Sequence, residues 1–277
     1  MNSSHFPTLA EHFGWGRHPF ADTQAMSAPW LSAGDERLLA SIRSMLLYGK
    51  SLGLCGPSGT GKSTLVRHLA AQLDPRHYRP IWIHYGGLNR AGLLRAVAHR
   101  IGVDPRGRSV PLLLRIQEQV LQPGTGGTGG FPVLILDDAH LAERESLMDL
   151  CSLLTCPERH TVAASLVLIG DGLLRQQLGL NVMAPVRGRL TGVFSLAPLT
   201  EAETADFIAH RLRQAKAPPG LFDDDALEMI AAGCRGNRRE IMNRATLLLE
   251  EAFVRQEKVV TAQTVIHCEC LENPGET

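Results

Sequence analysis

The chain has 277 residues, with 28 acidic and 28 basic side chains and a hydrophobic content of 44%. This balance excludes a highly basic packaging protein and a disordered tail, and it indicates a globular protein. No apolar run approaches the length of a membrane span, and the first twenty residues lack the basic-then-apolar order of a secretion signal. We therefore expect a cytoplasmic protein without membrane insertion.

Strand and helix patterns alternate through the first two thirds of the chain. An amphipathic helix is predicted at 35–49, after an N-terminal segment. Strands are predicted at 51–55, 81–85, 132–138, 165–170 and 193–196, and helices at 64–73, 91–102, 109–122 and 145–154. The glycine-rich stretch 123–130 is expected to be a flexible spacer.

The strand patterns are apolar throughout, which is typical of parallel strands buried on both faces. After Pro198 the pattern changes to helices only, at 201–215, 223–233, 237–256 and 261–270. We therefore predict an α/β fold: a parallel sheet flanked by helices over 36–198 and a smaller all-α domain over 199–277. The N-terminal segment, 1–35, is expected to pack on the sheet domain.

A phosphate-binding motif lies between the strand at 51–55 and the helix at 64–73. It consists of Gly56, Pro57, Ser58, Gly59, Thr60, Gly61, Lys62, Ser63 and Thr64. The first eight residues fit G-x-x-x-x-G-K-[ST] completely, in the strand-to-helix context that this motif requires. Backbone N–H groups and the helix N-terminus are expected to bind the phosphates of ATP. We expect Lys62 to reach the β- and γ-phosphates and the Ser63 hydroxyl to bind Mg²⁺.

Two acids end the apolar strand at 132–138. Asp137 is predicted to be the carboxylate on the Mg²⁺ side of the site. Asp138 stands where such sites often have a glutamate that polarises the attacking water. Its side chain is one methylene shorter, so we expect hydrolysis to be slow or to need a rearranged water. The alternative for Asp138 is an acid that caps a helix or stabilises a turn.

Arginines that stabilise charge on the transferred phosphoryl group have two candidate locations. Arg187 and Arg189 precede the last predicted strand, and Arg238 and Arg239 open a long helix of the all-helical part. For each arginine the alternative is a solvated residue that forms a salt bridge.

Cysteines and aromatic residues carry weaker signals. The six cysteines lack paired zinc spacings, and four lie in apolar contexts, so buried thiols are expected; Cys268 and Cys270 leave metal binding or oxidation open. A small hydrophobic cluster made by Phe13, Trp15 and Phe20 is expected to fasten the N-terminus.

The whole arrangement resembles an AAA+ ATPase, and more narrowly the ExeA/GspA-like group and the ATPase helper proteins encoded beside bacterial transposases. The likeness is carried by "FGWGRHPF", "GPSGTGKST", "LILDDAHLAERESLMDLCSLL", "SLVLIGDGLLRQQL", "RGRLTGVFSLAPLTEAETADFIAHRLRQA" and "FDDDALEMIAAGCRGNRREIMNRATLLLEEA". Together these stretches span nearly the whole chain. By position, Arg189 matches the arginine before the last strand, Arg239 matches the sensor arginine, and Gly170-Asp171 match the first sensor turn. The resemblance also places the turn at 18–20 near the adenine.

The sequence departs from this group at two positions. It reads "GDGLL" after the strand at 165–170, where the group often has proline and glutamate, and it has Asp138 where the group usually has glutamate. Both departures concern the hydrolysis rate more than nucleotide binding.

The resemblance implies an ATP-hydrolysing protein that oligomerises with nucleotide, binds double-stranded DNA and recruits or activates a transposase. The segment after the second strand would face DNA, through Asn89, Arg90, Arg95 and Arg100, although a solvated helix face is the alternative. Two other functions remain open. One is an accessory ATPase of a general secretion (type II) pathway, whose members usually continue into a membrane helix and a wall-binding domain; the other is a low-turnover, ATP-dependent assembly switch.

Overall fold

The computed structural model of the chain describes residues 8–21, 29–84, 87–106, 110–121, 130–156 and 161–272. It forms two compact units. The sheet unit comprises Ala33–Pro57 and Lys62–Leu196, and the helical unit comprises Met1–Ser32, Ser58–Gly61 and Ala197–Thr277. Within the described ranges, no helix is long and apolar enough to cross a membrane.

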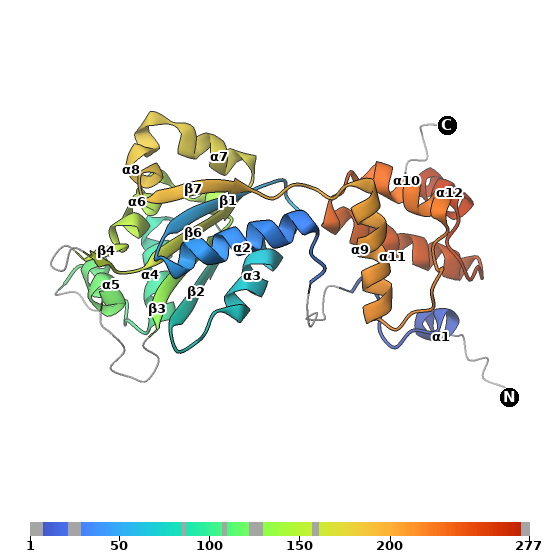
Figure 1. The fold of residues 1–277 in the computed structure, drawn as a ribbon, viewed down its shortest axis with the longest axis horizontal. Helices are drawn as coiled ribbons and strands as arrows, with labels where there is room; N and C mark the ends of the chain where they lie inside the picture. Colours follow the sequence, from blue (N-terminus) through green and yellow to red (C-terminus); the bar gives the residue numbers. More distant parts are fainter. Residues whose placement is uncertain are drawn as a thin grey trace. The chain divides into compact units, whose positions relative to one another are not determined.

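The sheet unit contains seven strands within its described residues, five of them in one sheet (Figure 1). The strands are β1 (Ser51–Cys55), β2 (Tyr78–His84), β3 (Phe131–Asp137), β4 (Thr155–Cys156), β5 (Thr161–Val162), β6 (Ser165–Gly170) and β7 (Leu190–Ser195). The helices are α2 (Ala33–Leu47), α3 (Lys62–Gln72), α4 (Arg90–Ile101), α5 (Leu112–Leu121), η1 (Ala139–Leu141), α6 (Arg144–Ser152), α7 (Gly172–Gly179), η2 (Asn181–Met183) and α8 (Ala184–Arg187).

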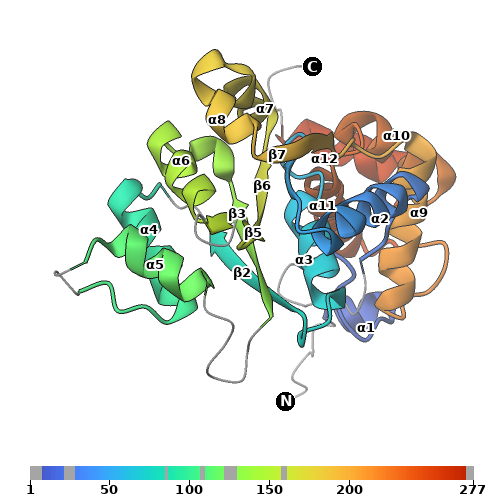
Figure 2. The same ribbon diagram turned by 60° about the vertical axis from the view of Figure 1, so that its left-hand side comes forward.

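The five-stranded sheet has the order β2-β3-β6-β1-β7, and all its paired strands are parallel. Side chains alternate between its faces: Leu134 and Leu136 of β3 join the apolar core that includes α4 and α5, while Val133 and Ile135 face the opposite side. Helices α2 and α3 cover one face and α4, α5 and α6 the other (Figure 2). The central strands are apolar throughout because both faces are buried.

The order of the strands decides where polar groups meet. The carboxyl ends of β3, β6 and β1 lie at one edge of the sheet, with β6 between the other two. Asp137 ends β3, Asp171 follows β6, and the phosphate-binding motif follows β1. In open parallel sheets this edge is where ligands bind.

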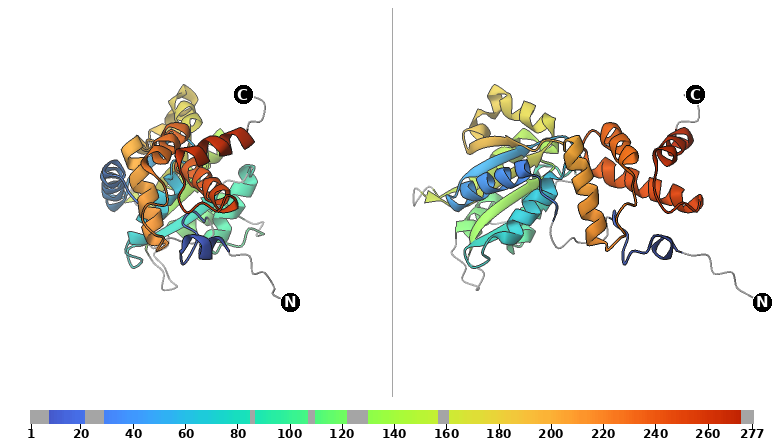
Figure 3. Two further views of the ribbon diagram at one scale, coloured as in Figure 1. Left: turned by 90° about the vertical axis from the view of Figure 1, so that its right-hand side faces the viewer. Right: turned by 45° about the vertical axis from the view of Figure 1, so that its right-hand side comes forward.

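The helical unit consists of α1 (Leu9–Phe13), α9 (Glu201–Gln214), α10 (Asp224–Cys234), α11 (Arg238–Val254) and α12 (Ala262–Glu272), and Figure 3 shows α9 to α12 from two directions. Its core includes Phe13, Trp15 and Phe20, which pack with apolar residues of α9, α10 and α11. His12 adds an edge contact to Phe253, with ring centroids 5.2 Å apart. The aromatic cluster thus fastens the N-terminal residues to the helical unit, whereas the sequence pattern placed them on the sheet domain. The difference arises because the side chains of Phe13, Trp15 and Phe20 bury their apolar surface against α9–α11.

The predicted fold class is confirmed: a parallel sheet flanked by helices, followed by a helical C-terminal region. Residues 172–187 form α7, η2 and α8, which the sequence patterns did not predict, and the two-residue strands β4 and β5 pair as an unpredicted hairpin. Most of the predicted spacer 123–130 lies outside the described residues.

The buried-thiol interpretation fits four cysteines. Cys55, Cys151, Cys234 and Cys268 are buried and form no disulfide with one another. Burial raises the pKa of Cys151 and of Cys234 to about 11, so both stay protonated at neutral pH. The side chain of Cys270 lies outside the described residues, and the metal or oxidation alternative for the C-x-C pair stays a prediction.

Candidate functional site

The phosphate-binding motif forms a loop between β1 and α3. Gly59 and Gly61 have φ values of +80° and +95°, in the region that L side chains rarely adopt. A side chain at position 59 is excluded for a second reason, because its Cβ would lie 2.1 Å from the Asn237 amide oxygen. The loop leads directly into the first turn of α3, where the positive end of the helix favours an anion.

Lys62 opens α3 and bonds back to the loop. Its Nζ donates to the carbonyl oxygens of Gly56 and Pro57, at 2.8 Å each. Burial lowers the pKa of the Lys62 ammonium, and the carboxylates of Asp171, Asp137 and Asp138 act in the opposite direction. The ammonium is therefore held at the loop, among the three acids at the sheet edge.

Ser63 and Asp137 face each other from α3 and β3. The Ser63 hydroxyl donates to Asp137 Oδ1 at 2.8 Å, and the residue Asp137 is only 6% exposed. Among the described residues Asp137 forms no ion pair within 4 Å, although buried carboxylates are normally paired or bound to a metal. A hydroxyl and a carboxylate are the hard oxygen ligands that Mg²⁺ takes, so this pair fits that ion. Thr64, the next residue, is exposed on the first turn of α3.

Asp138 has an unusual backbone conformation, with φ 54° and ψ 39°. It stands at the N-cap position of η1, but its side chain accepts no capping hydrogen bond. Its Oδ2 instead lies 3.7 Å from Nδ1 of His84, at the end of the neighbouring strand β2. Its carboxylate thus projects from the carboxyl edge of the sheet beside Asp137, whose Oδ1 accepts its backbone N–H.

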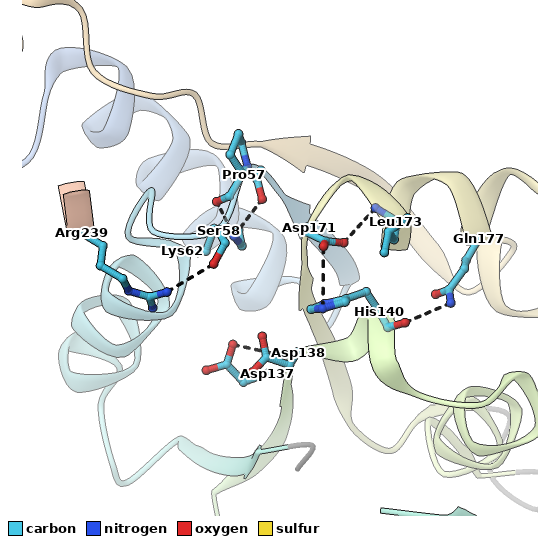
Figure 4. A network of polar contacts seen from close by, with 11 residues as sticks. Pro57, Ser58, Lys62, Asp137, Asp138, His140, Asp171, Leu173, Gln177 and Arg239 are labelled. Atoms are coloured by element: carbon cyan, nitrogen blue, oxygen red, sulfur yellow. Dashed lines mark hydrogen bonds and ion pairs between the residues drawn. The ribbon is translucent and has the colours of Figure 1, made fainter. Parts of the chain in front are cut away.

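A second polar pair at this edge joins His140 and Asp171 (Figure 4). Asp171 caps α7 by accepting from the Leu173 N–H at 2.8 Å, and its other oxygen lies 3.7 Å from His140 Nε2. The His140 carbonyl accepts from Gln177 at 3.0 Å. Sequence reasoning placed Asp171 at the sensor turn but missed His140, for which the only signal was its position three residues after Asp137.

The helical unit holds the centre of the phosphate-binding loop. The Asn237 amide donates to the Ser58 carbonyl at 2.8 Å, and the Arg239 N–H donates to the Gly59 carbonyl at 3.1 Å. The Arg238 guanidinium bonds the Thr60 carbonyl, and that of Arg239 reaches the Ser58 hydroxyl at 3.3 Å (Figure 4). The sequence pointed to Arg238 and Arg239 and missed Asn237.

The other two arginine candidates differ in what they contact. Arg187 donates to the carbonyls of Leu178 and Leu180, at 2.6 and 3.2 Å, and so satisfies the C-terminal end of α7. The backbone N–H of Arg189 donates to the Val186 carbonyl at 3.0 Å, but its side chain is exposed and makes no hydrogen bond or ion pair with the described part of the chain. Of the two, Arg189 is the one whose guanidinium is available to another molecule.

The predicted DNA-facing residues also divide into two kinds. Asn89 caps α4 by accepting from the Gly92 N–H, and Arg90 forms a bidentate pair with the buried Asp149 of α6, at 2.6 and 2.8 Å. Arg95 and Arg100 are exposed on α4. The first two therefore have structural roles, and the last two leave their charges in solvent.

A phosphate-binding loop between β1 and a helix, an acid at the end of a nearby strand and a parallel sheet of this order form a P-loop fold of the AAA+ type. Residues 47–178 match the family described as "AAA domain".

Solved structures resemble the chain over most of its length. The structure of the Aeropyrum pernix ORC1 protein in complex with DNA has a TM-score of 0.68 and 18% identity, covering 92% of this chain and 69% of that one. The Thermotoga maritima RuvB Holliday junction branch migration motor has a TM-score of 0.59 and 18% identity, covering 88% and 70%. At such identities the likeness establishes the fold.

A curated relative matches a shorter part. The hemin import ATP-binding protein HmuV of Bordetella parapertussis is 33% identical over 110 residues, 39% of this chain and 38% of its own length. The curated relatives that the chain matches are thus covered over well under half of their length.

Proposed function

We propose that this chain is a cytoplasmic AAA+ ATPase that binds ATP with Mg²⁺, oligomerises with nucleotide and acts on double-stranded DNA as a transposition helper, recruiting or activating a transposase. The observation that carries the ATPase assignment is the Ser63–Asp137 contact of 2.8 Å beside the lysine-bearing loop. The transposition role is supported by the sequence resemblance, and the DNA-binding role also by likeness to a fold solved in complex with DNA.

Each residue of the site has a distinct role in this proposal. The loop N–H groups and the Lys62 ammonium bind and orient the phosphates, and Ser63 and Asp137 hold the ion. Bound Mg²⁺ would neutralise charge on the phosphate oxygens. Asp138 orients the attacking water, and Arg239, already on the Ser58 hydroxyl, contacts the terminal phosphate. Arg189 reaches the nucleotide of a neighbouring copy, so that hydrolysis depends on assembly.

The DNA surface that we propose is the exposed side of α4. Residues 87–121 contain six arginines and two acidic residues, in a chain with no net charge. Arg90 is held by Asp149 and Arg106 by Asp104, whereas Arg95 and Arg100 remain exposed for phosphate contacts. Phosphate contacts of this kind position a protein on the duplex without reading its sequence.

This surface is tested by the salt dependence of DNA binding. The slope of log K against log salt is negative, and each lost phosphate contact reduces its magnitude by about 0.9. The double variant Arg95→Ala/Arg100→Ala is therefore expected to reduce this magnitude by about 2. Affinity for a short duplex is measured with ATP–Mg at several salt concentrations. Arg37→Ala/Arg43→Ala, which removes two exposed arginines from α2, is the matched control. No DNA binding by the unaltered chain at low salt would contradict the DNA role, and an equal effect of both double variants would contradict the placement on α4.

A low-turnover switch is the second candidate function, and the geometry of Asp138 favours it. The short carboxylate lies within 4 Å of His84, and a left-handed backbone fixes its direction. A water held by so short a side chain is expected to react slowly, so that ATP occupancy rather than turnover would control assembly.

Asp138→Asn distinguishes the two functions. Asparagine tolerates the left-handed conformation as well as aspartate does, so the change removes charge without backbone strain. If Asp138 acts on the water, phosphate release falls by about 10²-fold while nucleotide affinity stays within about twofold. An unchanged rate of phosphate release would show that Asp138 is a turn residue and would support the switch.

A further inference from the structure

The turn at the start of α11 contacts three consecutive peptide groups of the phosphate-binding loop. Asn237, Arg239 and Arg238 donate, respectively, to the carbonyl oxygens of residues 58, 59 and 60. All these residues belong to the helical unit, which includes Ser58–Gly61. The loop centre is therefore held on its carbonyl side by a continuous segment of three residues.

Holding three carbonyls also orients three N–H groups. In a planar trans peptide the C=O of one residue and the N–H of the next point in opposite directions. Donors on the carbonyls of residues 58, 59 and 60 therefore direct the N–H groups of residues 59, 60 and 61 away from the turn. The N–H groups of Gly59 and Gly61 donate to no described residue, and successive N–H groups that converge in this way form an anion site.

The single amide group of Asn237 makes contacts within α11 and one contact with the phosphate-binding loop. Its Oδ1 accepts from the N–H groups of Arg239 and Glu240, at 3.1 and 3.3 Å, which caps α11. Its Nδ2 donates to the Ser58 carbonyl at 2.8 Å, and also to the Glu240 carboxylate at 3.2 Å. An N-cap needs only an acceptor, and serine and aspartate serve as well as asparagine. The contacts within α11 therefore leave the shorter Nδ2 bond to the Ser58 carbonyl unexplained.

We propose that Asn237 is a positioning residue for the phosphate-binding loop: by holding the Ser58 carbonyl, it directs the following N–H groups towards a nucleotide phosphate. This inference rests on the proposed nucleotide binding and assigns to the start of α11 a role in nucleotide affinity. Because linkage is reciprocal, a nucleotide bound by the loop also stabilises the turn at 237–239.

Two substitutions separate capping from positioning. Asn237→Asp keeps the acceptor and the shape but removes the donor, and Asn237→Ser keeps a neutral cap too short to reach the Ser58 carbonyl. Both are expected to weaken binding of a fluorescent ADP with Mg²⁺ by about tenfold, the size of one lost hydrogen bond at the upper end of its usual range. The thermal midpoint without added nucleotide is expected to stay within about 2 °C of that of the unaltered chain, because the cap is kept.

The control is Asp223→Asn, which changes the charge by one at the N-cap of α10 and keeps that cap. Its affinity for the fluorescent ADP is expected to match that of the unaltered chain. Unchanged affinity for the fluorescent ADP in both Asn237 variants overturns the positioning role. A loss of affinity in Asn237→Asp alone also overturns it, because that result would reflect the added negative charge. Failure of the unaltered chain to bind the nucleotide would overturn the proposed function as well, so the two failures are distinguishable.

Discussion

Lys62→Ala is expected to reduce ATP hydrolysis by on the order of 10²-fold or more, the usual cost of removing one preorganised donor from a charged transition state. The Lys62 ammonium is half-buried and bonded to two loop carbonyls, at 2.8 Å each, so it is already placed where the phosphates bind. Alanine removes the positive charge that the loop places among Asp171, Asp137 and Asp138. We therefore expect nucleotide affinity to fall together with hydrolysis.

Phosphate release and binding of a fluorescent ADP measure the two effects separately. Lys50→Ala is the control, because Lys50 is an exposed lysine just after α2. The thermal midpoints of both variants show whether each remains folded. A folded Lys62→Ala protein that hydrolyses ATP at the rate of the unaltered chain would remove the basis of the proposed nucleotide site.

The parts of this site that lie close together in the sequence could be predicted from it. The loop from Gly56 to Ser63 follows from a local pattern of glycines between a strand and a helix, and the position of Asp137 follows from the apolar strand before it. Such patterns depend on backbone geometry within a few residues. The parallel sheet could be predicted for the same reason, because strands buried on both faces are apolar throughout.

Contacts between distant segments could not be predicted in the same way. Asn237 lies 179 positions from Ser58, and Arg90 lies 59 positions from Asp149. A sequence pattern that covers only neighbouring residues cannot predict either contact. His140 and Asp171 meet because β3 and β6 are neighbouring strands. The α7 helix was missed because it is only eight residues long and has glycine at both ends.

The arginines show how tertiary contacts decide between equal candidates. Arg187 and Arg189 are two positions apart and have the same chemistry. The Arg187 guanidinium, however, already donates to the carbonyls at the end of α7. The geometry thus leaves Arg189 as the better candidate for a contact in trans.

Arg189→Ala is expected to leave nucleotide affinity within about threefold of its original value and to lower hydrolysis by about 10³-fold, since an arginine supplied in trans contributes 10³–10⁵ to phosphoryl transfer. The side chain is exposed and bonds no described residue, so its removal is expected to leave the fold intact. Phosphate release is measured over a range of protein concentrations. The exposed Arg43 of α2 provides the control variant Arg43→Ala, which changes the charge equally.

A mixing experiment tests whether Arg189 acts on a neighbouring copy. Arg189→Ala protomers keep the lysine-bearing loop, and Lys62→Ala protomers keep the arginine, so each variant alone is expected to be inactive. In a mixed assembly, some intact loops lie next to an intact Arg189, and hydrolysis is expected to return in the mixture. If Arg189 acted only within its own chain, no complete site would form and the mixture would stay inactive. An inactive mixture of two folded, assembling variants would therefore contradict the assignment in trans, and full activity of Arg189→Ala alone would contradict any role of Arg189 in hydrolysis.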